Sequence, residues 1–153
     1  MTEHLPILIV LAPLLGAVFA ALTSWFWPRV SFPIVLAGLA ISCISSLLLV
    51  FEVPTSGVIH YQLGGWGKQK EYADMVVGIQ ISVDYLNGII LAAVTTIALL
   101  TAIYSQPTVE RELEGQQRYF YALFSLLVVG LLGITITGDI FNLYVFMEIA
   151  ALS

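Results

Sequence analysis

The chain has 153 residues, of which 59% are apolar and only 10% are charged, and its formal net charge is −5. Soluble domains average about 45–50% apolar and about 25% charged residues, so a water-soluble fold of this size is excluded. A nucleic-acid-binding protein is excluded too, because it needs a basic face and the sequence has no basic patch.

Two uncharged segments open the chain, residues 5–27 and residues 30–51. At about 1.5 Å per residue, each is long enough to cross a hydrocarbon core of about 30 Å. Between them lie Trp27, Pro28 and Arg29, which are typical of a membrane interface where a helix ends. The first segment lacks the positive n-region of a secretory signal and is longer than its apolar core, so we expect a retained helix.

Residues 52–83 differ in composition from the segments on either side. They are rich in glycine and carry most of the charged residues found before position 84. Residues 58–61 favour a strand by composition, and residues 79–83 alternate between apolar and polar side chains. The sequence therefore predicts a β-hairpin with a glycine-rich tip, lying on the membrane surface.

A third uncharged segment, residues 85–105, follows Asp84. A carboxylate at that position can accept hydrogen bonds from the free N–H groups of a first helical turn. We expect the helix to end near Pro107, and the charged residues 108–118 to form a short surface helix that begins there.

The fourth uncharged segment, residues 119–138, carries Gly130 and Gly133 on one face, which predicts close packing against a neighbouring helix. After Asp139 the chain becomes apolar again from Ile140 onward, but fourteen residues are too few to span a bilayer. A helix that stops inside the hydrocarbon leaves carbonyl groups unpaired, so we expect the N-terminal piece of a longer protein.

The sequence thus predicts an all-α membrane protein with one transmembrane domain, residues 1–153. It has about four complete transmembrane helices and a truncated fifth, with a surface β-hairpin between the second and the third. Arginines gather on one side of the predicted membrane and lysines on the other: Arg29, Arg111 and Arg118 against Lys68 and Lys70. The positive-inside rule then predicts a multi-pass protein of the cell membrane, with the connector 106–118 in the cytoplasm and the N-terminus and residues 52–83 outside.

One acidic residue lies within a predicted membrane helix. Glu148 follows Asp139 by nine residues, which places it roughly 13 Å into the fifth helix and near the midplane. A charged side chain there costs on the order of 2.5–3.5 kcal/mol, and such groups usually face a protein interior or a water-filled path. Hydrocarbon favours the protonated form of a carboxyl group, so we expect Glu148 to relay protons. The alternative is a tilted helix whose Glu148 reaches the interface and has no function.

Other polar residues have a structural and a functional interpretation. Asp84 and Asp139 precede predicted helices, which favours capping over transport. Asn142, Thr137 and Thr135 are candidates for a polar path near Glu148, although such residues in membrane helices more often make ordinary interhelical hydrogen bonds.

The sequence contains no cofactor or metal motif. Cys43 is alone in an apolar segment, which predicts a small core residue. His4 and His60 lie outside every apolar segment, so a haem held by a pair of intramembrane histidines is excluded. No nucleotide-binding motif or catalytic triad is present, so we expect no cofactor, no metal and no enzyme active site in this chain.

The segment 137–149, TGDIFNLYVFMEI, closely resembles the fifth transmembrane helix of the antiporter-like subunits. These subunits are shared by Mrp-type multisubunit cation/proton antiporters and respiratory complex I. The amino-acid sequence of this segment is most similar to that of the D-type antiporter subunits. The two leading helices and residues 81–87, ISVDYLN, agree with that resemblance. It implies that Glu148 is the family's helix-five glutamate, which pairs with a lysine on a later helix that this chain does not contain.

The resemblance implies a proton-translocating subunit of a multisubunit Na⁺/H⁺ antiporter, which moves H⁺ and either Na⁺ or K⁺ and assembles with other membrane subunits in the bilayer. A first alternative is a proton-pumping subunit of an NADH:quinone oxidoreductase or a membrane-bound hydrogenase, with the redox chemistry on other subunits. A second alternative is a membrane scaffold that transports nothing, in which Glu148 would be dispensable.

Overall fold

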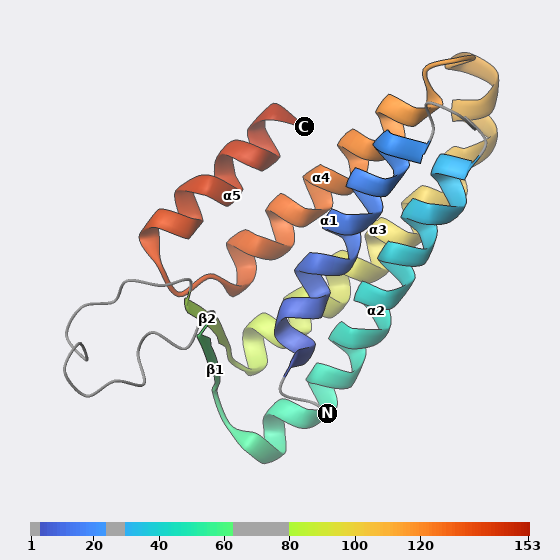
Figure 1. Cartoon of the computed structure of the whole chain (residues 1–153). Helices are drawn as coiled ribbons and strands as arrows, with labels where there is room; N and C mark the ends of the chain where they lie inside the picture. The colour runs from blue at the N-terminus through green and yellow to red at the C-terminus, as the bar shows by residue number, and fades with distance from the viewer. Residues whose placement is uncertain (1–3, 24–29, 63–79) are drawn as a thin grey trace.

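The computed structural model describes residues 4–23, 30–62 and 80–153 of the chain. Four helices are long and apolar enough to cross a membrane, and a shorter apolar helix follows them. A two-stranded antiparallel sheet lies between the second and the third helix (Figure 1). The predicted fold class is confirmed. The elements in chain order are α1 (Leu5–Thr23), α2 (Ser31–Ser56), β1 (Ile59–Gln62), β2 (Gln80–Val83), α3 (Tyr85–Glu112), α4 (Gln117–Ile136) and α5 (Ile140–Leu152).

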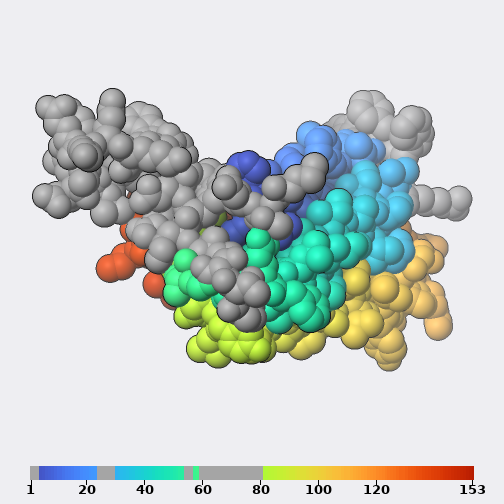
Figure 2. Space-filling view, turned by 90° about the horizontal axis from the view of Figure 1, so that it is seen from below, coloured from blue at the N-terminus to red at the C-terminus, as the bar shows by residue number. Residues whose placement is uncertain are grey.

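The helices α1 to α4 form a bundle, and α5 returns antiparallel along α4 (Figure 1). Seen from below in Figure 2, α2 and α3 lie side by side along one face of the bundle. Leu39, Leu91 and Leu132 have no exposed surface, so apolar packing fills the centre. The predicted interface at residues 27–29 and the hairpin tip with its two lysines lie outside the described residues.

The expected end of the third helix is wrong, because α3 continues through Pro107 to Glu112. Proline removes only one intrahelical hydrogen bond, the one to the carbonyl four residues earlier. Pro107 itself faces outward, and Val109 packs into the core with 4% of its surface exposed. This burial stabilises the extra turn, so no separate surface helix forms at residues 108–118. A short turn containing Gly115, with φ +79°, joins α3 to α4.

Helix α2 also extends further than predicted, to Ser56 instead of residue 51. Gly57 follows with φ +74°, and its N–H donates to the carbonyl of Val53 at 2.9 Å. Glycine adopts positive φ without a steric penalty, so a glycine just past the helix is a common stop. The predicted hairpin segment therefore begins with the last helical turn of α2.

A proline in α1 leaves one backbone carbonyl of that helix without its intrahelical donor, and α2 supplies a side-chain donor in its place. Pro13 lies inside α1 and has no N–H, so the carbonyl of Ile9, four residues earlier, lacks its intrahelical donor. The Ser42 hydroxyl of α2 donates to that carbonyl at 2.6 Å, and the Ser125 hydroxyl of α4 donates to the Pro13 carbonyl at 2.7 Å. Unpaired carbonyls are expensive in hydrocarbon. These two serines therefore join α1 to both of its neighbours.

Small side chains also bring α2 close to its neighbours. A Cβ at Gly38 would lie 2.8 Å from the carbonyl oxygen of Ala12 in α1, so only glycine permits this approach. On the side facing α3, the hydroxyls of Ser46 and Thr95 are 2.7 Å apart. Cys43 is buried and is a free thiol, as expected for a small core residue.

The hairpin lies at the end of the bundle where α3 begins and α4 ends (Figure 1). Its register pairs Ile59 with Val83, and Ile81 forms an additional bridge with Thr137. Ile81 and Val83 are buried. Strand β2 is thus attached to the turn that leads into α5, which holds the start of α5 against the bundle.

Candidate functional site

Two glycines of α4 determine where α5 lies. A Cβ at Gly130 would be 2.7 Å from the Cβ of Ala150 and 2.9 Å from its backbone nitrogen. A Cβ at Gly133 would lie only 2.2–2.5 Å from three carbon atoms of the Phe146 ring. The predicted packing of this glycine face against a neighbouring helix is confirmed, and the neighbour is α5. Because neither glycine carries a side chain, Ala150 and the Phe146 ring lie directly against the backbone of α4, which gives α5 a defined position along that helix.

Glu148 lies on the opposite face of α5. It is two residues from Phe146 and two from Ala150, the residues that pack on α4, and two residues correspond to about 200° around a helix. The side chain is exposed in the described structure. No hydrogen bond or ion pair joins it to another residue in the part of the chain that the structure describes. The carboxylate therefore projects away from the four-helix bundle.

The contacts with α4 also give the level of Glu148 along the bundle. Its neighbours at positions 146 and 150 pack on Gly133 and Gly130, so Glu148 lies level with residues 131–132 of α4. This level is about five residues, or about 7 Å, from the middle of α4 toward its C-terminal end. The carboxyl group thus lies within the length of a membrane-spanning helix, closer to the hairpin end than the centre of that helix is.

Asp84 and Asp139 both make hydrogen bonds at helix starts. The Asp84 carboxylate accepts a hydrogen bond from the backbone N–H of Asn87 at 2.7 Å, at the first turn of α3. The Asp139 carboxylate accepts one from the N–H of Phe141 at 3.2 Å, at the first turn of α5. A negative charge at a helix N-terminus is also stabilised by the helix dipole. Both acids therefore have structural partners.

The three candidate path residues have different surroundings. The Thr135 hydroxyl donates to the carbonyl of Leu131 at 2.8 Å, within α4. The Thr137 hydroxyl donates to the carbonyl of Asp139 at 3.2 Å, within the turn between α4 and α5. The structure therefore brings Thr137 and Asp139 together in this turn.

Asn142 is buried, with 6% of its surface exposed, and its side-chain nitrogen has no hydrogen-bond partner among the described residues. Its position on α5 is one turn before Phe146, so it shares the face that packs against α4. Glu148 lies on the other face. Among the described residues, no hydrogen bond links the threonines or Asn142 to Glu148.

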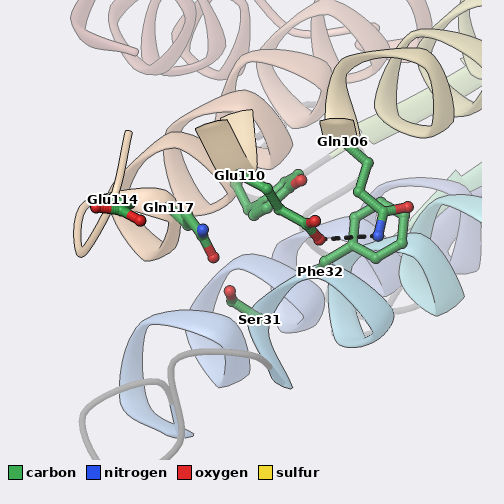
Figure 3. A pocket seen from close by; sticks show the side chains of 7 residues that line it. Ser31, Phe32, Gln106, Glu110, Glu114 and Gln117 are labelled. Atoms are coloured by element: carbon green, nitrogen blue, oxygen red, sulfur yellow. Dashed lines mark hydrogen bonds between the residues drawn. The ribbon is translucent and has the colours of Figure 1, made fainter. Parts of the chain in front are cut away.

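The structure also shows a polar pocket that the sequence analysis did not identify (Figure 3), beside the α3–α4 turn at the end of the bundle opposite the hairpin. A sequence signal for it exists, because Gln106 and Glu110 on α3, and Gln117 and Tyr121 on α4, are each four residues apart and so share a helix face. Within the described residues, no group of three or more His, Cys, Asp or Glu side chains is arranged to hold a metal ion.

Comparison with known proteins finds relatives of the chain, although no family model matches it. The chain is 35% identical to the N subunit of the NADH-quinone oxidoreductase of Desulforudis audaxviator, over 158 aligned residues that cover 100% of the chain and 29% of the relative. It is 33% identical to the D subunit of the Na⁺/H⁺ antiporter of Bacillus subtilis over 113 residues, which cover 74% of the chain and 21% of the relative. The chain therefore spans less than a third of the length of these relatives.

Two solved structures have the same fold. A chain of the membrane-bound sulfane sulfur reductase, an archaeal respiratory membrane complex, superposes with a TM-score of 0.83 at 25% identity and covers 97% of this chain and 29% of its own length. A chain of the Mrp complex from a Dietzia species superposes with a TM-score of 0.76 at 22% identity and covers 99% of this chain and 26% of its own length. Both are parts of multisubunit membrane complexes.

Proposed function

We propose, from the premise that this chain is a homologue of the antiporter-like membrane subunits, that it forms part of a proton-translocating subunit of a multisubunit Na⁺/H⁺ antiporter. The observation that carries the proposal is Glu148, a single carboxyl group in the apolar helix α5. Other membrane subunits of the complex are the expected partners, and H⁺ with Na⁺ or K⁺ are the expected ions.

The physical basis is the unequal cost of the two forms of Glu148. A charged carboxylate within the hydrocarbon is expensive, whereas the protonated form is tolerated, so proton binding and release are the accessible changes of charge. A cationic side chain brought near Glu148 would favour the charged form and release the proton. In the proposed mechanism, this change in electrostatic coupling moves the proton on, and the close packing of α5 on α4 keeps the carboxyl group in place.

A second candidate function is that of a proton-pumping subunit of an NADH-quinone oxidoreductase. It is favoured by the relative whose alignment covers the whole chain, because that relative is a subunit of such a complex. In this alternative the same Glu148 moves protons within a redox-driven complex, and the redox cofactors lie on other subunits. The two candidates differ in their partners, since flavin- and iron–sulfur-binding subunits would co-purify only with the second. In the scaffold alternative, Glu148 would have no role in transport.

The proposed membrane orientation places the turn after α3 in the cytoplasm and the hairpin outside the cell membrane. It is supported by the arrangement of the elements, because the start of α1 and the hairpin share one end of the bundle and the α3–α4 turn lies at the other (Figure 1). Both arginines that the structure describes, Arg111 and Arg118, lie beside that turn. The positive-inside rule then favours the cytoplasm for this end.

The test replaces Glu148 with Gln in the full-length protein and measures cation-dependent proton flux in inverted membrane vesicles. Glutamine has nearly the same shape but cannot exchange a proton, so we expect at least a tenfold loss of flux, the scale associated with losing a positioned acid–base group. The matched control is Glu112→Gln, which removes an exposed carboxylate at the end of α3. Wild-type flux from an assembled Glu148→Gln complex would refute the proposal.

A further inference from the structure

Helix α5 packs on α4 with one face and leaves the rest of its surface uncovered by the described helices. In Figure 1 it lies at the edge of the molecule, with α4 on one side and no other described helix beyond it. Its exposed side chains are mostly large and apolar. They are Ile140, Phe141, Val145, Met147 and Leu152, which are 37–84% exposed. A polar group on such a surface is costly unless it has a hydrogen-bond partner.

Two polar side chains interrupt this apolar surface, Tyr144 and Glu148. Tyr144 is 64% exposed, and Glu148 is exposed as well. Four residues turn a helix by about 400°, so the two side chains lie about 40° apart around α5, with their Cβ atoms about 5–6 Å apart. The other polar side chain inside this helix, Asn142, is buried on the face toward α4. Tyr144 is therefore the polar neighbour of Glu148 on its own face.

Neither of these two groups has a partner in the described structure. The side-chain hydrogen bonds within α5 are made by Asp139 and Ser153, at its two ends. Among the described residues, no hydrogen bond or ion pair involves the Tyr144 hydroxyl or the Glu148 carboxylate. In hydrocarbon, a hydroxyl without an acceptor and a carboxylate without a donor both cost free energy. One bond between them would remove both costs.

The helix directs these two side chains toward such a bond. Side chains of a helix lean toward its N-terminus, so the carboxyl group of Glu148 extends over the turn that carries Tyr144. A phenol hydroxyl keeps its proton at neutral pH and can donate it, and an ionised carboxylate is a strong acceptor. Exposed side chains change rotamer within picoseconds to nanoseconds, so both groups are free to adopt the bonded geometry.

The elements that contact α5 offer no competing ionisable group at this level. Strand β2, which is attached to the turn before α5, has none. Asp139 lies nine residues before Glu148 and accepts a hydrogen bond from the first turn of α5. On α4, the Thr135 hydroxyl already donates to a carbonyl of its own helix. The ionisable residues of α4 lie at least ten residues, or about 15 Å, from the level of Glu148. They are Arg118, Tyr119 and Tyr121.

We propose that the Tyr144 hydroxyl donates a hydrogen bond to the Glu148 carboxylate and positions it on the outer face of α5. Such a bond favours the charged form of the carboxyl group, because an ionised carboxylate is the stronger acceptor. Tyr144 is then a positioning residue that sets the pH range in which Glu148 binds its proton. The consequence for transport rests on the proposed function of Glu148, whereas the hydrogen bond itself does not require that Glu148 relays protons.

The experiment titrates Glu148 by infrared spectroscopy in the purified full-length protein. The carbonyl band of its protonated carboxyl group is assigned by the absence of that band from Glu148→Gln. We expect Tyr144→Phe to move the midpoint of this titration upward by about one to two pH units, because losing a donor to the charged form lets the protonated form persist to higher pH. The pH dependence of cation-dependent proton flux in vesicles should move in the same direction.

The matched control is Tyr104→Phe, which removes the hydroxyl of a tyrosine on α3 that is 85% exposed and far from α5 in the chain. It should leave the midpoint unchanged. The other role open to Tyr144 is that of an anchor with its hydroxyl among lipid headgroups. An unchanged midpoint in the Tyr144→Phe protein would favour that anchor and overturn the inference, and so would a shift to lower pH.

An equal shift in both tyrosine variants would also overturn the inference, because it would show a general effect of removing a phenol. The proposed function is tested separately by the flux of Glu148→Gln. If that variant kept wild-type flux while Tyr144→Phe still moved the midpoint of the infrared titration, the proton relay would be refuted and the hydrogen bond would stand. If Glu148→Gln lost flux while Tyr144→Phe left the midpoint unchanged, the hydrogen bond alone would be refuted.

Discussion

Replacing Gly130 with Ala tests whether the contact between α4 and α5 holds Glu148 in place. The added methyl group would lie 2.7 Å from the Cβ of Ala150, 2.9 Å from its nitrogen and 3.0 Å from its Cα. Nonbonded carbon atoms prefer about 3.5–4.0 Å, so the two helices must separate by about 1 Å. No change of rotamer relieves this clash, because the neighbouring atoms are backbone atoms and a Cβ. Overpacking of this kind typically costs about 1–3 kcal/mol.

The same displacement affects the candidate site, because Ala150 is only two residues from Glu148. Proton transfer requires heavy atoms within about 2.6–3.2 Å of one another, and a carboxyl group moved by about 1 Å no longer meets this condition. We therefore expect Gly130→Ala to lower the unfolding temperature and to reduce cation-dependent proton flux about tenfold or more, since errors of this size in positioning can cost up to about 10²-fold.

The matched control is Gly16→Ala in α1, where the added Cβ would meet its nearest neighbours, Ile34 and Val35, at 3.7 Å. This is ordinary contact, and alanine favours helix over glycine by up to about 1 kcal/mol, so stability should stay the same or rise. Thermal unfolding of the purified full-length proteins and vesicle flux provide the two measurements. If Gly130→Ala behaved like Gly16→Ala in both, the inferred role of the α4–α5 contact would be wrong.

Two further substitutions, Ser42→Ala and Asp84→Ala, test hydrogen bonds that position the helices, and Ser105→Ala is the control for the first. Ser42→Ala leaves the carbonyl of Ile9 unpaired in the core and should destabilise the protein by about 1–3 kcal/mol in thermal unfolding. Ser105→Ala should cost less than about 0.5 kcal/mol, because the carbonyl it contacts keeps its backbone donor, and equal losses in the two variants would contradict this reasoning. Asp84→Ala removes the cap of α3 and should cost about 1 kcal/mol. Amide exchange should then accelerate at Asn87, and unchanged exchange there would show that the cap does not stabilise this turn.

The transmembrane architecture could be predicted because lipid tolerates so few charges. The uncharged segments, with Asp84 and Asp139 at their ends, predict the starts of α1 to α5 and the end of α4 within two residues of the observed bounds. The spacing of Gly130 and Gly133 also identified the face that packs closely. These features depend on local composition and on the period of a helix, which a sequence displays directly.

The features that could not be predicted depend on tertiary contacts. Pro107 is a reasonable helix stop in isolation, but the burial of Val109 extends α3 past it. The hydrogen bond between Ser42 and Ile9 joins two helices and satisfies the carbonyl that Pro13 leaves without a donor. The pocket around Tyr121 is formed by three helices, and an unpaired hydroxyl is visible only when its surroundings are known.

The structure of the bundle also bears on where a proton would travel. In its centre, Ile9, Leu39 and Leu132 have no exposed surface. Among the described residues the buried hydroxyls make only local hydrogen bonds: Ser42 and Ser125 each donate to a carbonyl of α1, and those of Ser46 and Thr95 pair with each other between α2 and α3. A proton path needs groups that can exchange partners, and none crosses the described bundle. If Glu148 relays protons, the path therefore runs along the face of α5 that points away from α4. The four helices of the bundle then hold α5, and with it Glu148, in position.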